Sequence, residues 1–370
     1  MRTIDRRNWL RTVGLSGSFA LLGGLDTFAL SPLETLKTFD GPVRLSSNEN
    51  PYGPSERVRA VITNAFDEAC RYPFSVLSNL VEKIADKEGV SKDHIVVTGG
   101  STEGLKAVGL TYGLNGGELI AADPTFQSMM SYAETFGGHV HRVPVDDKMQ
   151  HDLNAMADRI TNKTSLVFIC NPNNPTGTLL DKNALKDFCT SHDHQTMIFS
   201  DEAYYDFITE PEYPSMIELV KEGRNVIVSK TFSKVYGLAG LRIGYLVARP
   251  DIATRLKASV MANTNILAIA AAKEALQDDE FYKFSVLKNK EAKQLIYKTL
   301  DDLSLPYIPS HTNFVFFKTG RPVDEVIQAM QKENVLIGRP FPPLLEWARI
   351  STGTLPQVKQ FTAALTKVMG

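Results

Sequence analysis

The sequence contains little cysteine: only Cys70, Cys170 and Cys189 occur in 370 residues. None of the three belongs to a CxxC pair, and an odd number in so long a chain does not suit a disulfide framework. We therefore expect all three thiols to pack inside the protein. The seven histidines form no helix-face pair with a carboxylate between them, which argues against a zinc site. We predict no catalytic metal.

The chain also lacks a large charge of either sign and a long hydrophobic run. Its 40 Lys and Arg residues nearly balance 42 Asp and Glu residues, so the net charge is −2. This balance excludes the broad positive field of a dedicated nucleic-acid binder, although a small anionic ligand needs only a local basic site. An uncharged stretch at residues 12–25 is shorter than the roughly twenty residues that a transmembrane helix needs. We expect no nucleic-acid partner and no stable membrane span.

Residues 1–30 have the layout of an export signal. Arginines precede the uncharged stretch, and a Thr-Phe-Ala sequence ends at Ala29, a layout that matches a signal cleavage site. The adjacent Arg6 and Arg7, followed by Asn8-Trp9-Leu10, are typical of a twin-arginine signal. We expect export to the periplasm. The alternative is an amphipathic N-terminal helix on a cytoplasmic protein.

Short apolar runs alternate with helical patterns from about residue 95 to residue 250. This alternation predicts an α/β protein with a mostly parallel, doubly wound sheet. The runs are nearly continuous in apolar character, as in strands that are covered on both faces. We expect strands at residues 95–98, 118–122, 165–170, 197–200, 225–229 and 242–247.

The pattern changes after Pro250. A long charged helical stretch is predicted at residues 256–303, and strands at 311–317 and 348–351 precede a closing helix at 356–368. The length of the chain favours two domains. We predict a large domain over residues 61–254 and a smaller α+β domain that combines residues 31–60 with residues 255–370.

Polar groups follow several of the predicted strands, and ligands of open parallel sheets bind at that edge. Gly99-Gly100-Ser101-Thr102 opens a helix, where free N–H groups and the helix dipole can hold a phosphate. Asp201 closes an apolar strand, where a buried carboxylate needs a cationic partner, and Tyr204 follows three residues later. Asn171 begins a dense turn after another strand, so its amide could meet a ligand oxygen. These positions predict a binding site at the strand ends.

Lys234 follows the strand at residues 225–229, within Thr231-Phe232-Ser233-Lys234. A lysine in a partly desolvated site among cationic neighbours has a lowered pKa and can form a Schiff base. Taken alone, a solvated surface lysine is the simpler interpretation. The aspartate, the asparagine and the phosphate site on neighbouring strand ends favour the catalytic interpretation.

In combination, these motifs resemble the pyridoxal-phosphate-dependent aminotransferases of fold type I, and within them the histidinol-phosphate aminotransferase family. The resemblance runs from about residue 43 to the C-terminus and implies an α/β fold with a large cofactor domain and a smaller α+β domain. It rests on Ser47 through Pro54, Arg71-Tyr72-Pro73, Asn171 through Gly177, Asp201 through Tyr204, Thr231 through Lys234 with Arg242, and Arg349 through Thr354.

The resemblance implies pyridoxal 5'-phosphate as the cofactor and a role for each matching residue. Lys234 would form the Schiff base and shuttle the proton at the substrate's α-carbon, while Asp201 would keep the pyridine nitrogen protonated. Asn171 and Tyr204 would bind the 3-oxygen, and Phe126 would stack on the ring. The cofactor phosphate would lie among Gly100, Ser101, Thr102, Ser233 and Arg242.

The resemblance also implies a homodimer with shared active sites, in which Tyr72 reaches the phosphate of the neighbouring subunit's cofactor. Arg349 would bind the α-carboxylate of an amino acid such as glutamate, and Tyr52, Asn171 and Arg339 would complete the substrate site. Planar guanidinium groups bind both carboxylates and phosphates. We therefore predict transamination between L-histidinol phosphate, or a related amino acid or amine, and 2-oxoglutarate.

Three alternatives stay open at this point. The first is an aminotransferase for aromatic or other amino acids, which an exported protein would favour because histidine biosynthesis is a cytosolic pathway. The second is a decarboxylase of the phosphothreonine type that uses the same cofactor. The third is a cofactor-binding module without catalysis, although the presence of Lys234, Asp201 and Arg242 argues against it.

Overall fold

The structure is a computed structural model that describes residues 41–370, and these form one compact unit. The predicted export signal and residues 31–40 of the first small-domain segment lie outside the described residues. None of the helices in the described range is both long enough and apolar enough to cross a membrane. Since residues 41–370 form a single unit, the two-domain boundary stays a prediction.

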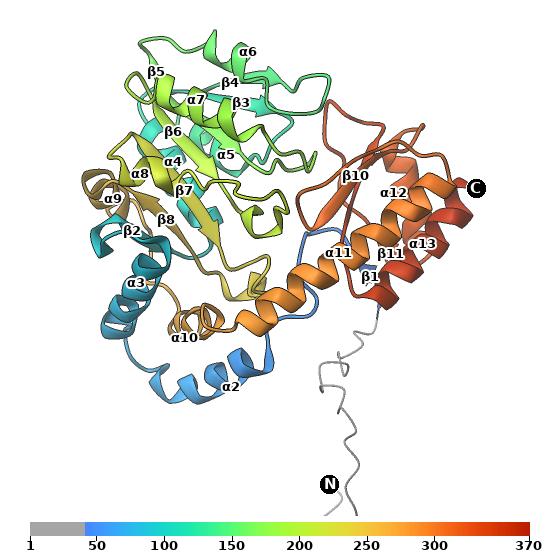
Figure 1. Cartoon of the computed structure of the whole chain (residues 1–370), viewed down its shortest axis with the longest axis horizontal. Coiled ribbons are helices and arrows are strands. Elements are labelled where there is room, and N and C mark those ends of the chain that lie inside the picture. Colours follow the sequence, from blue (N-terminus) through green and yellow to red (C-terminus); the bar gives the residue numbers. More distant parts are fainter. Residues whose placement is uncertain (1–40) are drawn as a thin grey trace, which may run out of the picture. The chain divides into compact units, whose positions relative to one another are not determined.

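A seven-stranded sheet forms the centre of the fold, in the order β2-β8-β7-β6-β5-β3-β4 (Figure 1). Its neighbours pair in parallel from β7 to β4, and only β8 runs antiparallel to the strands beside it. This confirms the predicted, mostly parallel α/β sheet. The strands are β2 Ile95–Thr98, β3 Glu118–Asp123, β4 His139–Pro144, β5 Thr164–Cys170, β6 Met197–Asp201, β7 Val226–Thr231 and β8 Gly244–Ala248.

Helices cover both faces of this sheet, which explains why its strands are apolar almost throughout. In β5, Val167 and Ile169 face one buried cluster, while Leu166 and Phe168 face the other. The helices of the first cluster are α2 Glu56–Asn64, α3 Phe74–Glu88, α6 Leu153–Ala157, α7 Lys182–His192, α8 Ile217–Lys221 and α10 Ile266–Ala275. Those of the second are α4 Ser101–Gly113, α5 Ser128–Thr135 and α9 Pro250–Lys257.

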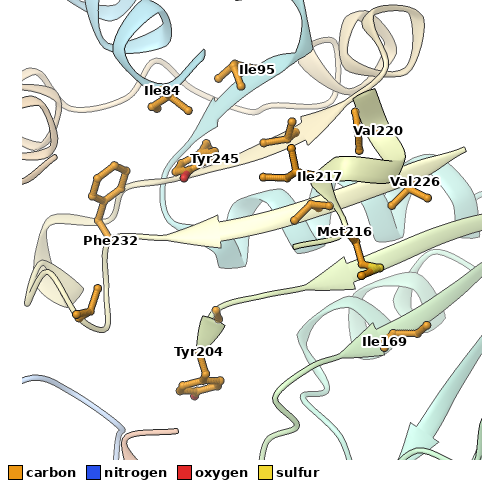
Figure 2. Close-up of a cluster of buried hydrophobic side chains, with 14 of the residues drawn as sticks. Ile84, Ile95, Ile169, Tyr204, Met216, Ile217, Val220, Val226, Phe232 and Tyr245 are labelled. Carbon is orange, nitrogen blue, oxygen red and sulfur yellow. The ribbon is translucent and has the colours of Figure 1, made fainter. Parts of the chain in front are cut away.

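Figure 2 shows part of the first cluster, where side chains from the sheet and from the helices meet. Met216, Ile217 and Val220, at and within α8, lie against the sheet beside Val226 of β7. Tyr204 projects from the loop that follows β6, so this aromatic ring belongs both to the core and to the strand-end edge.

A second, smaller sheet is built by the C-terminal part of the chain. Its three strands pair antiparallel in the order β12-β10-β9. Near the start of the described chain, β1 Val43–Arg44 pairs in parallel with β11 Val335–Leu336. A third buried cluster joins this sheet to its helices. These elements are β9 Tyr307–Ile308, β10 Phe314–Lys318, β12 Trp347–Ser351, α11 Asp279–Asp302, α12 Val323–Lys332 and α13 Leu355–Met369.

The helical stretch predicted at residues 256–303 is divided mainly between α10 and α11, because it contains two internal helix starts. Asn265 caps α10 by accepting from the backbone N–H of Leu267 at 2.8 Å, and Asp278 caps α11 by accepting from Phe281 at 3.1 Å. Helix α10 packs on α3 and on α2 Glu56–Asn64 (Figure 1). The prediction for the cysteines is also wrong at one position, because Cys70 is exposed whereas Cys170 and Cys189 are buried.

Candidate active site

A cavity of about 240 Å³ lies at the carboxyl ends of β5, β6 and β7. Loops after these strands, the first turn of α4, the segment after β1 and one side chain of β12 surround it. Sheets of this kind bind ligands at that edge. The lining residues are Ser47, Asn48, Glu49, Ser101, Thr102, Phe126, Cys170, Asn174, Asp201, Ala203, Tyr204, Ser233, Lys234, Ala239, Arg242 and Arg349.

Asp201 is the last residue of β6, and only 2% of it is exposed. Its Oδ1 accepts one hydrogen bond, from the backbone N–H of Ala203 at 3.2 Å, and no cation of the described residues forms an ion pair with it. Burial raises the pKa of the Asp201 carboxyl to about 7, against the lowering effects of Ala203 and Lys234. A buried carboxylate with so few partners suits a protonated ring nitrogen.

Lys234 lies in the loop that follows β7 and lines the cavity. Its Nζ donates to the carbonyl oxygen of Asn48 at 2.9 Å and lies 5.4 Å from the centre of the Tyr204 ring. Burial first, and then the Arg349 guanidinium, lower the pKa of the Lys234 ammonium to about 8. A larger share of the free amine is therefore present near neutral pH, as a nucleophile or a proton acceptor requires.

The first turn of α4 and Arg242 form a site for an anion. Gly100 has a φ of 83°, and a Cβ there would collide with the Arg242 guanidinium, so the close approach requires glycine. Arg242 donates from Nη1 to the carbonyl oxygen of Ala239 at 2.7 Å, with the Ser233 hydroxyl at 3.5 Å. Helix N–H groups and a guanidinium together bind phosphate strongly. Ser101, Thr102, Ser233 and Arg242 line the cavity as predicted, whereas Gly100, the N-cap of α4, does not line it.

A hydrogen-bonded network holds the Tyr204 hydroxyl at the cavity wall. Asn48 donates to it from Nδ2 at 2.9 Å, and Asn174 donates from Nδ2 at 3.3 Å. The Asn48 amide is itself fixed, because its Oδ1 accepts from the Ser351 hydroxyl at 2.8 Å. Burial raises the pKa of the Tyr204 phenol, so the hydroxyl stays protonated and can donate.

Asn171 does not reach the cavity, and its predicted place is taken by Asn174. The Asn171 amide donates to the Tyr213 hydroxyl at 2.7 Å and accepts from the backbone N–H of Leu180 at 2.9 Å. Both of its polar atoms are therefore used inside the protein. Asn171 and Asn174 each precede a proline in the same turn, so sequence reasoning could not tell which side chain would face the ligand.

Arg349 extends from β12 into the cavity, and 7% of it is exposed. Its guanidinium donates to Asn174 Oδ1 at 2.6 Å and to the Ser46 carbonyl oxygen at 2.9 Å, while Nε is buried without a partner. Burial lowers the pKa of this group to about 10, which leaves it charged at neutral pH. Within residues 41–370, the hydrogen-bond acceptors of this buried cation are neutral oxygens. Such a cation is suited to bind a carboxylate or phosphate.

Phe126 lines the cavity, whereas three other predicted residues lie outside it. Tyr52 packs edge-on against Phe284 at 5.1 Å, and its hydroxyl accepts from the backbone N–H of Leu355 at 3.3 Å. Arg339 is exposed and stacks on Phe341 at 4.5 Å. Tyr72 is 77% exposed. One subunit therefore brings together most of the predicted cofactor site, without Asn171 and Tyr72. Of the predicted substrate site, it places Arg349 in the cavity.

Residues 40–365 match the family model for aminotransferases of class I and II. The histidinol-phosphate aminotransferase of Moorella thermoacetica is 38% identical over 331 residues, which cover 88% of this chain and 85% of the relative. That of Bacillus cytotoxicus is 33% identical, with 88% and 89% covered. The crystal structure of histidinol-phosphate aminotransferase from Sinorhizobium meliloti in complex with pyridoxal-5'-phosphate is 26% identical, with a TM-score of 0.82 over 94% of this chain and 99% of that one.

The geometry of the cavity and these relationships agree. The buried acid, the lysine with a lowered pKa and the anion site at α4 fit pyridoxal phosphate, which is the cofactor of this chain. The chain therefore belongs to the class I and II aminotransferase family of fold type I, and it is a pyridoxal-phosphate-dependent enzyme that catalyses transamination.

Proposed function

We propose that the chain transfers the amino group of L-histidinol phosphate, or of a related imidazole-bearing donor, to 2-oxoglutarate. The proposal is supported by two histidinol-phosphate aminotransferases that match this chain over most of their length. The observation that carries it is Arg349, a buried guanidinium close to Lys234 whose partners are all neutral. Such a group can bind the phosphate of L-histidinol phosphate and a carboxylate of 2-oxoglutarate.

Each charged or polar group at the strand ends then has a defined task. Pyridoxal phosphate supplies a carbonyl that takes the amino group and a protonated ring that withdraws electrons from the substrate's α-carbon. Asp201 would pair with the ring nitrogen, and the Tyr204 hydroxyl would donate to the 3-oxygen. Arg242 and the first turn of α4 would hold the phosphate.

Lys234 moves the proton. With its pKa lowered to about 8, the Nζ amine can take a proton from the substrate's α-carbon and return it one position away. The carbonyl oxygen of Asn48, 2.9 Å from Nζ, orients the amine. Asn174 links the Arg349 guanidinium to the Tyr204 hydroxyl, so substrate and cofactor contacts share one rigid amide.

A spectral titration tests this proposal. The protein loaded with pyridoxal phosphate is titrated with L-histidinol phosphate, L-glutamate and aromatic amino acids while the cofactor absorbance is recorded. We expect L-histidinol phosphate to convert the spectrum at much lower concentration than aromatic amino acids do, and Lys234→Ala to abolish turnover. Conversion by ordinary amino acids alone would refute the substrate, and release of carbon dioxide would indicate the decarboxylase.

We also propose that the active enzyme is a homodimer in which Tyr72 completes the neighbouring site. Tyr72 stacks on Phe74 at 5.9 Å, and both rings are largely exposed, as are Phe66 and Met261. Exposed aromatic and apolar side chains of this kind favour an interface. Mixing Tyr72→Ala with Lys234→Ala protein should restore activity, because each mixed dimer contains one intact site. No recovery in a verified mixed dimer would refute the sharing.

We further propose that residues 1–30 direct export through the twin-arginine route, and the support comes from the sequence alone. Cell fractionation of the full-length protein and of an Arg6→Lys/Arg7→Lys variant tests this proposal. Wild-type protein in the periplasm and variant protein retained in the cytoplasm is the expected result. Equal cytoplasmic location of both proteins would refute export.

A further inference from the structure

The proposed mechanism leaves one charged cavity residue without a task. Five charged side chains line the cavity, and four of them serve the cofactor or the carboxylate of the substrate: Asp201, Lys234, Arg242 and Arg349. The fifth is Glu49, which follows Asn48 in the segment after β1. A carboxylate inside a site that binds anions is unfavourable unless it meets a donor of its own.

The backbone places Glu49 beside the reacting centre. The Ser46 carbonyl oxygen accepts from Arg349 at 2.9 Å, and the Asn48 carbonyl oxygen accepts from Lys234 at 2.9 Å. Residues 46–48 therefore bridge the anion-binding group and the reacting amine. The peptide group between Asn48 and Glu49 therefore contacts the Lys234 amine through its carbonyl oxygen. Glu49 lines the same cavity as Lys234 and Arg349.

One oxygen of this carboxylate is free for a ligand. Arg44 donates from Nη2 to Glu49 Oε1 at 2.9 Å, with side-chain exposures of 63% and 35%. Within residues 41–370, Oε2 accepts no hydrogen bond. An exposed ion pair of this kind contributes little to the stability of the fold. It orients the Glu49 carboxylate and leaves Oε2 available to a ligand.

We propose that Glu49 determines specificity for the side chain of the amino donor, by accepting a hydrogen bond from the N–H of an imidazole or of another cationic group. This inference rests on the proposed function and assigns the recognition of the donor side chain within it. A charge-assisted hydrogen bond rewards a side chain with an N–H. A hydrocarbon ring of the same size would cover the carboxylate without a donor, which is unfavourable.

Binding of two matched acids tests the assignment without turnover. The protein loaded with pyridoxal phosphate is titrated by calorimetry with 3-(imidazol-4-yl)propionate and with 3-phenylpropionate, which share a carboxylate and differ in the ring. We expect wild-type protein to prefer the imidazole acid, and Glu49→Gln to weaken its binding by about tenfold while the phenyl acid changes by less than about twofold. Glu56→Gln, which removes an exposed charge at the start of α2, is the matched control.

The outcomes separate this inference from the proposed function. No preference in the wild type, an equal change for both acids in Glu49→Gln, or the same selective loss in Glu56→Gln would each overturn the role of Glu49. If Glu49→Gln binds no cofactor, Glu49→Asp replaces it, with a reduced preference for the imidazole acid expected and an unchanged one overturning the role. Turnover of L-histidinol phosphate by the wild type is measured separately, and its absence would reject the proposed function itself.

Discussion

Replacing Asp201 by Asn is expected to stabilise the cofactor-free protein increasingly as the pH rises from 5 to 7.5. In the folded chain, burial raises the pKa of this carboxyl from 3.8 to about 7. Unfolding returns the carboxyl to water, where it ionises readily. The side chain that holds the cofactor thus lowers the stability of the protein without cofactor, and an amide of similar shape removes the ionisation.

The sign and size follow from proton linkage. Between pH 3.8 and about 7 the folded state retains the proton that the unfolded state has released, so the free energy of unfolding falls as the pH rises. The slope is about 1.4 kcal/mol per pH unit. From pH 5 to the folded-state pKa, the wild type therefore loses about 3 kcal/mol that the Asn variant keeps.

Denaturant unfolding of the cofactor-free proteins at pH 5 and pH 7.5 measures this difference. Asp147→Asn, a change of the same chemistry at an exposed position, controls for net charge and should show no such divergence. Addition of pyridoxal phosphate should favour the wild type, because the ring nitrogen then neutralises Asp201. A gap between Asp201→Asn and wild type that is constant or shrinks with pH would refute the reasoning.

Three further changes probe the surroundings of the site. Lys230→Met removes the cation 2.7 Å from the buried Glu202 carboxylate, and denaturant unfolding should show a loss of about 3–5 kcal/mol; a neutral effect would contradict the buried ion pair. Asn48→Ala removes a donor to the Tyr204 hydroxyl and should weaken pyridoxal phosphate binding about tenfold in a spectral titration; unchanged affinity would contradict the network. Phe341→Leu removes the ring that two guanidiniums contact, and should raise the half-saturating concentration of glutamate about threefold in steady-state kinetics, with kcat nearly unchanged; a loss confined to kcat would contradict this role.

Local sequence patterns were sufficient for six of the seven strands of the large sheet and for most of the cofactor site. Strands buried on both faces are read from apolar runs alone, because every position is covered. Asp201 and Lys234 were found because each directly follows such a strand or its short loop, where the topology of parallel sheets collects ligands. The edge strand β4 escaped detection because its sequence is polar and mostly exposed.

Contacts between distant segments decided the rest. Asn171 and Asn174 have the same local surroundings in the sequence, and only packing against Tyr213 and Leu180 turns the first of them away from the cavity.

The position of Asn48 beside Tyr204 likewise depends on residues 156 apart along the chain. Composition and periodicity thus determined the class of fold and the strand ends that carry the chemistry, since both follow from burial along a single segment. The tertiary structure decided which polar side chain faces the ligand, because that choice depends on hydrogen-bond partners supplied by other segments.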